Sequence, residues 1–400
     1  MNVIVYRYNS ISEPGYITAF RTLGLNVREC RRTDGNMQIY DRMEKLAALI
    51  RQEKPLFVFS INYFPFISMV CEKLRTIYLA VSVDCPVFEI YDMSVRSPYN
   101  RIFLFDRAQY FSVRDENPRG VFHLPLGADV KRIEENVGVF DVEGTRDFEY
   151  DVSFVGSLYS EKDSYSALRL PRKANERFLS LMGEQAKRPG LGLIEKSLTE
   201  EDLEILRLAD PGFRPSDRSV CDISKSYAVD SYFCDHLTVK DRSDLMNTLA
   251  AALPKGSLHL FTLSDTSGLT GVVCHDGVNS STQMPLVFRR SRININHTMR
   301  AIRTGLPQRI WDVLGSGGFL LTNAQEEIPD YLNPGEHLEV YTDNKELIEK
   351  VHYYLDNEDE RCRIALAGYM EVKERHTVLH RVAEMIRLIV TGEGSAEDRS

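Results

Sequence analysis

Short, almost wholly apolar runs alternate with helical patterns along the first part of the chain. Residues 56–61 (LFVFSI) and 77–83 (IYLAVSV) are apolar at nearly every position, as expected of strands that are covered on both faces of a sheet. Helical patterns separate these runs, and this order predicts right-handed crossovers and a parallel sheet. Residues 1–148 are therefore predicted to form a Rossmann-like α/β domain.

A second alternating set begins with residues 150–155 (YDVSFV) and predicts another Rossmann-like domain over residues 149–388. The stretch from about 160 to 255 contains helical patterns and no convincing strand, so we predict a helical insertion in this domain. The end of the chain, residues 391–400, is predicted to be disordered. Open α/β sheets bind ligands outside the carboxyl ends of their strands, so the two domains are expected to face a cleft that holds the site.

The length and composition of the chain exclude several classes of protein. A chain of 400 residues is too long for one ordinary core, which agrees with two domains. The formal net charge of −9 argues against a sequence-independent nucleic-acid binder, which needs a basic face. No apolar run is long enough to span a bilayer, and the first residues do not resemble a signal peptide. Seven scattered cysteines without a CxxC pair indicate a cytoplasmic protein without a disulfide scaffold or a cysteine-rich zinc site.

The segment 304–323 (TGLPQRIWDVLGSGGFLLTN) carries the clearest chemical signal. Pro307 stands where a helix favours its first residue, and the apolar residues from Leu306 onward have helical spacing. The glycines of GSGG end this helix, whereas a phosphate-binding glycine loop follows a strand and opens a helix. A helix cap with a tight turn is the simpler interpretation of these glycines. The chain has no complete GxGxxG, which argues against a dinucleotide oxidoreductase.

The first turn of the same helix suggests an anion site. Free N–H groups at a helix N-terminus attract phosphate, and Arg309 adds a forked cation. Asp312 lies three residues later on the same face, where it is placed to accept hydrogen bonds from ribose hydroxyls. This arrangement suits a nucleoside diphosphate. The alternative is an ordinary surface ion pair between Arg309 and Asp312 on an amphipathic helix. The spacing alone favours this alternative.

Longer motifs give the chain a family resemblance. SRININHTMRAIRTGLPQRIWDVLGSGGFLLTNAQEEIPDYLNPGEHLEVY, DVSFVGSLYSEK and YYLDNEDERCRIALAGYMEVKERHT resemble the C-terminal domain of the CgeB-like (spore maturation protein B-like) glycosyltransferases, relatives of the group-1 transferases. VFSINYFPFIS, VSVDCPVFEIYD, NRIFLFDR and FHLPLGAD resemble the domain that precedes it in many members. The resemblance covers about residues 1–385. It implies the GT-B architecture, a nucleotide-sugar donor on the C-terminal domain, no cofactor and no essential metal.

The resemblance also implies donor-site residues. Asp312 matches the ribose-binding acid of group-1 transferases, a position that is usually Glu. Thr304 stands eight positions earlier, where those enzymes carry another acid near the donor sugar. Besides Arg309 and Asp312, the implied donor-binding residues are Gly156, Ser157 and the weaker candidate Lys162, the nucleobase-side pair Gly277 and Val278, the strand-end pair Asn296 and Thr298, and the helix-start residues Leu306 and Pro307.

The acceptor is expected on the N-terminal domain, where the signals are weaker. Asp84 follows a buried strand, at the edge where ligands bind, and is the preferred acceptor-side and catalytic candidate. Asp106 also follows a buried strand. The alternative role for Asp106 is an ordinary salt bridge to its neighbour Arg107. Glu13 opens the first helix, where a carboxylate is more often a helix-dipole partner than a base. Asn62 and Tyr63 follow the LFVFSI strand, with turn chemistry as the equal alternative.

The prediction is therefore a metal-independent glycosyltransferase that moves a sugar from a nucleotide-sugar donor to an unidentified acceptor. Arg309 is expected to hold the diphosphate as charge builds on the leaving group, and Asp312 to bind the ribose. Two alternatives stay open. One is a nucleotide-sugar epimerase on the same architecture. The other is a non-catalytic scaffold that binds a nucleotide sugar or a protein partner, which Thr304 at the position of the second acid leaves possible.

Overall fold

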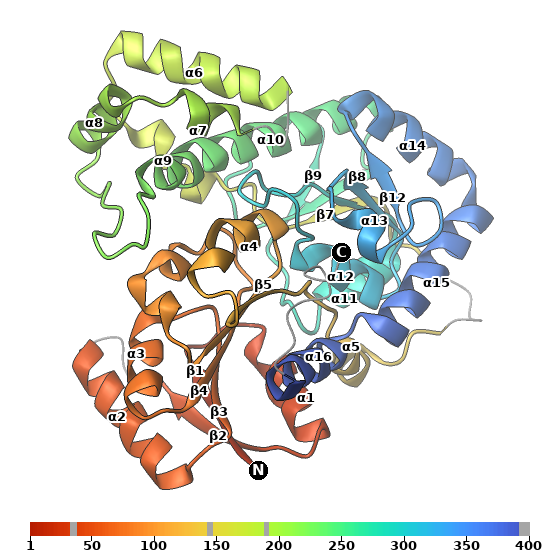
Figure 1. The fold of residues 1–400 in the computed structure, drawn as a ribbon. Coiled ribbons are helices and arrows are strands. Elements are labelled where there is room, and N and C mark those ends of the chain that lie inside the picture. Colours follow the sequence, from red (N-terminus) through yellow and green to blue (C-terminus); the bar gives the residue numbers. More distant parts are fainter. Residues whose placement is uncertain (33–37, 142–146, 188–191, 392–400) are drawn as a thin grey trace.

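Two six-stranded parallel sheets, each covered by helices, form the framework of the protein (Figure 1). The computed structural model describes residues 1–32, 38–141, 147–187 and 192–391. The predicted α/β architecture with two Rossmann-like sheets is confirmed.

The N-terminal sheet has the strand order β2-β1-β3-β4-β5-β6. Strand β3 (Phe57–Ile61) is buried along its whole length because helices cover both faces of the sheet. The other strands are β1 (Asn2–Arg7), β2 (Asn26–Arg31), β4 (Ile77–Val81), β5 (Asn100–Leu104) and β6 (Val121–His123). The helices are α1 (Glu13–Thr22), α2 (Ile39–Glu53), α3 (Pro65–Lys73), α4 (Arg107–Val113) and α5 (Val130–Val137).

The C-terminal sheet has the order β12-β11-β10-β7-β8-β9, in which the chain turns from one edge to the other beside β7 (Tyr150–Val155). This strand begins and ends where the sequence predicts. The other strands are β8 (Leu258–Phe261), β9 (Val273–His275), β10 (Ser291–Asn296), β11 (Leu320–Asn323) and β12 (Glu339–Tyr341). The helices are α11 (Met284–Arg290), α12 (Gln308–Gly315), α13 (Ile328–Tyr331), α14 (Asn344–Asp356) and α15 (Glu358–Arg375).

The segment between β7 and β8 is helical, as the sequence predicts, and it has an apolar core of its own. Its helices are α6 (Arg172–Lys187), α7 (Leu193–Ser197), α8 (Glu200–Ala209), α9 (Ser224–Ala228) and α10 (Asp235–Ala252), with a π-helical turn (Val229–Cys234) before the last. The insertion also contacts the N-terminal domain. Arg218 forms an ion pair with Asp92 at 3.2 Å, and the rings of Phe88 and Tyr227 lie 4.8 Å apart.

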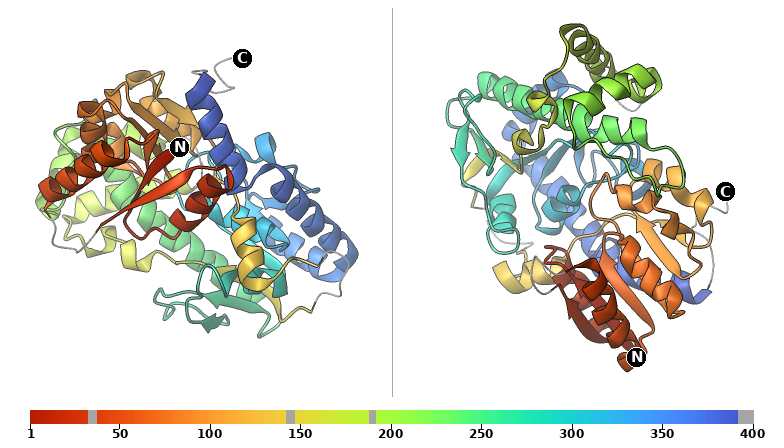
Figure 2. Two further views of the ribbon diagram at one scale, coloured as in Figure 1. Left: turned by 90° about the horizontal axis from the view of Figure 1, so that it is seen from below. Right: turned by 90° about the vertical axis from the view of Figure 1, so that its left-hand side faces the viewer.

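The last helix, α16 (Val378–Thr391), packs on the N-terminal sheet beside α1, as Figures 1 and 2 both show. Its buried residues Val382, Met385 and Leu388 share a core with Val3 and Phe20. The sequence predicts this helix but places it with residues 149–388, because an amphipathic pattern does not say which sheet the helix covers. The predicted disordered tail lies outside the described residues, apart from residue 391.

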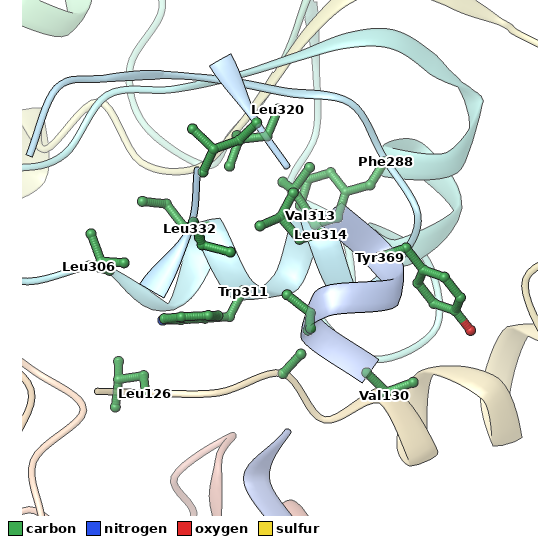
Figure 3. Close-up of a cluster of buried hydrophobic side chains, with 14 of the residues drawn as sticks. Leu126, Val130, Phe288, Leu306, Trp311, Val313, Leu314, Leu320, Leu332 and Tyr369 are labelled. Carbon is green, nitrogen blue, oxygen red and sulfur yellow. The ribbon is translucent and has the colours of Figure 1, made fainter. Parts of the chain in front are cut away.

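An apolar core joins the two domains (Figure 3). Leu126 and Val130 come from the segment that leaves the N-terminal domain, and they face Trp311 and Leu314 on α12. Trp311 is the only tryptophan of the chain and is fully buried. The position of α12 is therefore fixed by contacts from both domains.

Candidate functional site

Helix α12 places a carboxylate at the boundary between the domains. The chain leaves β10 and bends at residues 304–305, and Pro307 precedes the first helical residue, Gln308. Gln308 Nε2 donates to Asp312 Oδ1 at 2.9 Å and to the Gly127 carbonyl of the segment between the domains at 3.0 Å. The Asp312 side chain keeps 20% of its surface exposed. One oxygen of this carboxylate is therefore oriented by the protein.

Asp312 lines a pocket to which both domains contribute. The C-terminal domain supplies α12 and the start of α11, whereas the N-terminal domain supplies the start of α1 and the turn before α5. The polar lining residues are Ser12, Tyr16, Asp129, Arg132, Ser280, Ser281, Gln308, Asp312 and Ser316. Most of these residues were not singled out from the sequence, because they come together only when the domains meet.

The electrostatics of the pocket centre on two carboxylates. Burial raises the pKa of Asp312, against the opposing effects of Arg309 and of the hydrogen bond from Gln308. Burial also raises the pKa of Asp129, and repulsion from Asp312 adds to this shift. A carboxylate held in such a place is a strong hydrogen-bond acceptor for the hydroxyl groups of a ligand.

Arg309 lies in the first turn of α12 and on the same face as Asp312, as the sequence predicts, but its guanidinium is directed toward α11. Its Nη1 lies 2.5 Å from Met284 Sδ and 3.5 Å from Asp312 Oδ2, and the guanidinium stands 5.3 Å from the centre of the Phe288 ring. Burial lowers its pKa. The Arg309 side chain packs against α11, and Arg309 is not among the described residues that line the pocket. The predicted contact of this guanidinium with a diphosphate is therefore not supported by its placement.

Asp106 is not an acceptor contact. Its side chain is buried, and its carboxylate accepts the backbone N–H groups of Arg303, Thr304 and Gly305 at 2.7–3.2 Å. It also caps α4 by accepting the N–H of Gln109 at 2.9 Å. Its neighbour Arg107, the alternative partner, forms an ion pair with Asp330. Asp106 instead joins the domains at the turn before α12.

Two further acceptor-side candidates have structural roles. Glu13 is fully buried and accepts from Arg7 Nε at 2.9 Å and from the Tyr8 N–H at 2.7 Å, so it closes the turn between β1 and α1. Tyr63 is buried in the core, and its hydroxyl lies 2.8 Å from Ser94 Oγ and 3.2 Å from Asn100 Nδ2. The predicted contacts of both residues with an acceptor are wrong because neither side chain reaches the surface.

Asn62 and Asp84 lie together at the carboxyl ends of β3 and β4. Asn62 Nδ2 donates to Asp84 Oδ2 at 2.6 Å and to the Tyr8 hydroxyl at 3.2 Å, while its Oδ1 accepts the Val83 N–H at 3.1 Å. Asp84 is exposed. The structure thus brings these two predicted residues into one hydrogen-bonded group that an acceptor could reach.

The loop after β7 is held firmly by its own side chains. Ser157 Oγ donates to Glu161 Oε1 and accepts the Tyr159 N–H, both at 2.6 Å. This hydroxyl is therefore used within the loop that begins at Gly156. Lys162 is exposed, with its ammonium 4.8 Å from the centre of the Tyr159 ring.

A buried arginine that sequence reasoning missed connects this loop to the one after β10. Arg242 on α10 donates to the Ser157 carbonyl at 2.5 Å and to the His297 carbonyl at 2.6 Å. Burial lowers its pKa to about 10. The sequence did contain a signal for this arginine. Arg242 lies on the apolar face of the predicted helix, three residues before the buried Leu245 and seven before the buried Leu249.

The predicted strand-end pair does not face the pocket. Asn296 is buried and donates to Thr322 Oγ1 at 2.8 Å, and the Thr298 N–H donates to Asn323 Oδ1 at 2.7 Å. These groups join neighbouring strand ends.

The remaining predicted donor residues differ in their exposure. Leu306 is buried in the core between the domains, and Pro307 is half-buried before α12. Gly277 is exposed after β9, whereas the half-buried Val278 packs against the core between the domains. Of these residues, only Gly277 is exposed.

Within residues 1–32, 38–141, 147–187 and 192–391, no three His, Cys, Asp or Glu side chains are grouped so that they could hold a metal ion. Among the helices of these same segments, none is both long and apolar enough to cross a membrane.

Sequence comparison places the clearest similarity in the C-terminal half. Residues 242–387 match the family model described as glycosyl transferase-like. An uncharacterized protein from Aquifex aeolicus is 31% identical over 107 residues, which are 26% of this chain and 27% of that protein. The match thus spans about a quarter of that relative.

Structural comparison extends over the whole chain. A sucrose-phosphate synthase from Thermosynechococcus elongatus has a TM-score of 0.55 at 10% identity, over 98% of this chain and 100% of that one. A glycosyltransferase from Rickettsia africae has a TM-score of 0.52 at 9% identity, over 98% of both chains. Anabaena Alr3699/HepE in complex with UDP and glucose has a TM-score of 0.51 at 8% identity, over 98% and 100%.

At these identities the structural likeness shows the fold alone. The expected GT-B architecture is confirmed, whereas the CgeB-like affiliation stays a prediction. This chain has the GT-B fold of glycosyltransferases, and its residues 242–387 are similar to the glycosyl transferase-like family.

Proposed function

We propose that the protein is a glycosyltransferase that binds a nucleotide-sugar donor in the pocket between the domains and transfers the sugar to an acceptor on the N-terminal domain. One observation carries the proposal: the Asp312 carboxylate, oriented by Gln308, opens into a pocket that both domains line. The family match of residues 242–387 and the GT-B fold support it. The CgeB-like affiliation and a cytoplasmic location belong to the same proposal.

The donor would be held by α12. Gln308 binds Asp312 Oδ1, so Oδ2 would accept hydrogen bonds from ribose hydroxyls. No described residue accepts a hydrogen bond from the backbone N–H groups of Gln308 and Arg309, and such groups at a helix N-terminus bind phosphate. They would stabilise the charge that builds on the leaving diphosphate. We therefore expect the nucleotide to bind without added metal.

The acceptor would be held by Asn62 and Asp84. Asn62 orients the exposed Asp84 carboxylate through the hydrogen bond of 2.6 Å, which leaves the other oxygen to accept from an acceptor hydroxyl. Closure of the two domains around both substrates would exclude water and favour transfer over hydrolysis.

A non-catalytic nucleotide-sugar binder is the second candidate, and Thr304 favours it. The Thr304 hydroxyl accepts the Ala108 N–H at 3.1 Å and lies 3.4 Å from Asp106 Oδ1. It is thus engaged in the junction between the domains, at the position where group-1 transferases are expected to carry an acid.

Incubation with a panel of nucleotide sugars, without acceptor, separates these candidates. A transferase should slowly release free sugar and nucleoside diphosphate, detected by mass spectrometry, and Asp312→Asn should slow this release about tenfold or more. Isomerised sugar would instead indicate an epimerase, and binding without turnover a scaffold. Absence of both binding and turnover across the panel would contradict the proposal. Asp356→Asn, an exposed residue at the end of α14, is the matched control.

A further inference from the structure

A second pocket lies on the N-terminal domain, near the carboxyl ends of β1 and β3. Its volume of about 340 Å³ falls within the range of small-molecule sites. Its lining comes from the carboxyl ends of β1 and β2, from the segment between β3 and α3, from the first turns of α2 and α3, from Asp92 and from Arg218 of the insertion. It is separate from the pocket that Asp312 lines, with which it shares no described residue.

One side of this second pocket is aromatic. The Phe64 ring lies 5.7 Å from the Tyr6 ring and 5.2 Å from the Tyr8 ring, and the Tyr6 and Phe66 rings are 5.4 Å apart, all edge to face. Tyr6 and Phe66 are buried. Rings packed against one another in this way form a rigid apolar wall, which suits a ligand with a ring or another apolar surface.

The charged lining residues are unbalanced in favour of cations. Three arginines, Arg32, Arg42 and Arg218, line the pocket, and among the described lining residues the only acid is Asp92. Asp92 is already paired with Arg218 at 3.2 Å. In the part of the chain that the structure describes, no acid forms an ion pair with the guanidinium of Arg32 or of Arg42.

Arg42 gives the strongest sign of a missing ligand. Its Nε is buried and has no hydrogen-bond partner among the described residues. A buried donor without a partner is costly, and for a charged group the cost is larger. An anionic oxygen in the pocket would supply this partner.

We propose that this second pocket binds the acceptor of the transfer reaction, and that the acceptor carries a phosphate or carboxylate next to an apolar or ring-shaped part. The inference rests on the proposed function. Tyr8 connects the two, because its hydroxyl accepts from Asn62 Nδ2, which also donates to Asp84. An acceptor with its anionic end at Arg42 would thus extend past Tyr8 toward the Asp84 carboxylate.

Calorimetric titration with 1-naphthyl phosphate, 1-naphthoate and 1-naphthol tests this inference. At least one of the two anions should bind, more tightly than the neutral naphthol, and the tighter anion identifies the preferred group. Arg42→Gln should weaken that binding about tenfold or more, because a charge-assisted hydrogen bond is lost. Arg51→Gln, an exposed residue on the same helix, should leave the affinity unchanged.

The controls separate this inference from the proposed function. Asp312→Asn should leave binding of the naphthyl anions unchanged, whereas Arg42→Gln should leave binding of a nucleoside diphosphate unchanged. Equal affinity of wild type and Arg42→Gln for the anions, or no binding by the wild type, overturns the acceptor pocket. Loss of anion binding in Asp312→Asn would also overturn it, because the probe would then occupy the pocket between the domains. Thermal unfolding of each variant shows whether the fold is kept.

Discussion

The carboxylate of Asp106 accepts a hydrogen bond from the backbone N–H of Gly305, 199 residues later in the chain, at 3.2 Å. The same oxygen accepts the N–H groups of Arg303 and Thr304. One side chain of the N-terminal domain thus binds three consecutive N–H groups of the C-terminal domain. Because these groups lie three to five residues before α12, Asp106 and the apolar core between the domains together fix the position of Asp312 relative to the N-terminal domain.

Replacement of Asp106 should destabilise the protein more than loss of a helix cap alone. In Asp106→Ala, the three N–H groups of the turn and that of Gln109 lose their acceptor, and we expect the free energy of unfolding to fall by about 3–5 kcal/mol. Asp343 is a matched control, because it caps α14 and, among the described residues, accepts only the Glu346 N–H. Asp343→Ala should cost about 1 kcal/mol. Equal losses in urea unfolding would show that the junction adds nothing to stability.

Arg242 should affect donor binding through the two loops that it joins. Arg242→Met keeps most of the apolar stem but leaves the carbonyls of Ser157 and His297 without their donor. We expect the affinity for a nucleoside diphosphate to fall about tenfold, with a loss of about 1–3 kcal/mol in stability. Lys240→Met, an exposed change on the same helix, should alter neither. Unchanged nucleotide affinity in Arg242→Met would remove these loops from the donor site.

Stability should fall in mild acid because of His376. Burial, with help from Arg381 and against the effect of Glu371, lowers its pKa from 6.5 to about 4. Between these values the unfolded chain binds more protons than the folded one, so the free energy of unfolding decreases as pH falls. From pH 7 to pH 5 this one group should cost about 2 kcal/mol.

Urea unfolding of His376→Gln at both pH values measures this contribution. The variant should lose less stability on acidification than the wild type, whereas His352→Gln, an exposed change on α14, should behave like the wild type. Trp311 is a suitable reporter, because it is the only tryptophan and its ring lies 5.3 Å from that of His376. If His376→Gln and the wild type lost the same free energy of unfolding on acidification, other groups would be responsible for the effect.

The sheets were predictable because their signal is local. Strands buried on both faces, such as β3 and β4, are nearly continuous apolar runs bounded by turns. Strand β12 has only three residues, which is too short for a pattern to emerge. The docking of α16 on the N-terminal sheet was not predictable, since it depends on a contact with α1 more than 350 residues away in the sequence.

A residue of the candidate site could be predicted only where its role follows from the helix or strand that carries it. The helix that carries Asp312 follows from its own sequence, and the structure adds the pocket that Asp312 lines. Asp84 and Asn62 stand at strand ends, where the fold rule places ligands. Asp106 stands at a strand end as well, but its partners belong to the other domain, and strand position does not reveal this. Arg309 packs against Met284 and Phe288 of α11, and the sequence of α12 alone does not reveal this contact between two helices of one domain.

Calorimetric titration with nucleoside diphosphates, without added metal, tests the central claim most directly. The wild type should bind at least one of UDP, GDP and ADP, and Asp312→Ala should weaken this binding by about 1–3 kcal/mol, because the ribose hydroxyls lose their acceptor. Asp356→Ala should bind like the wild type. Equal affinity of Asp312→Ala and wild type for every nucleotide that binds would contradict a donor site at α12.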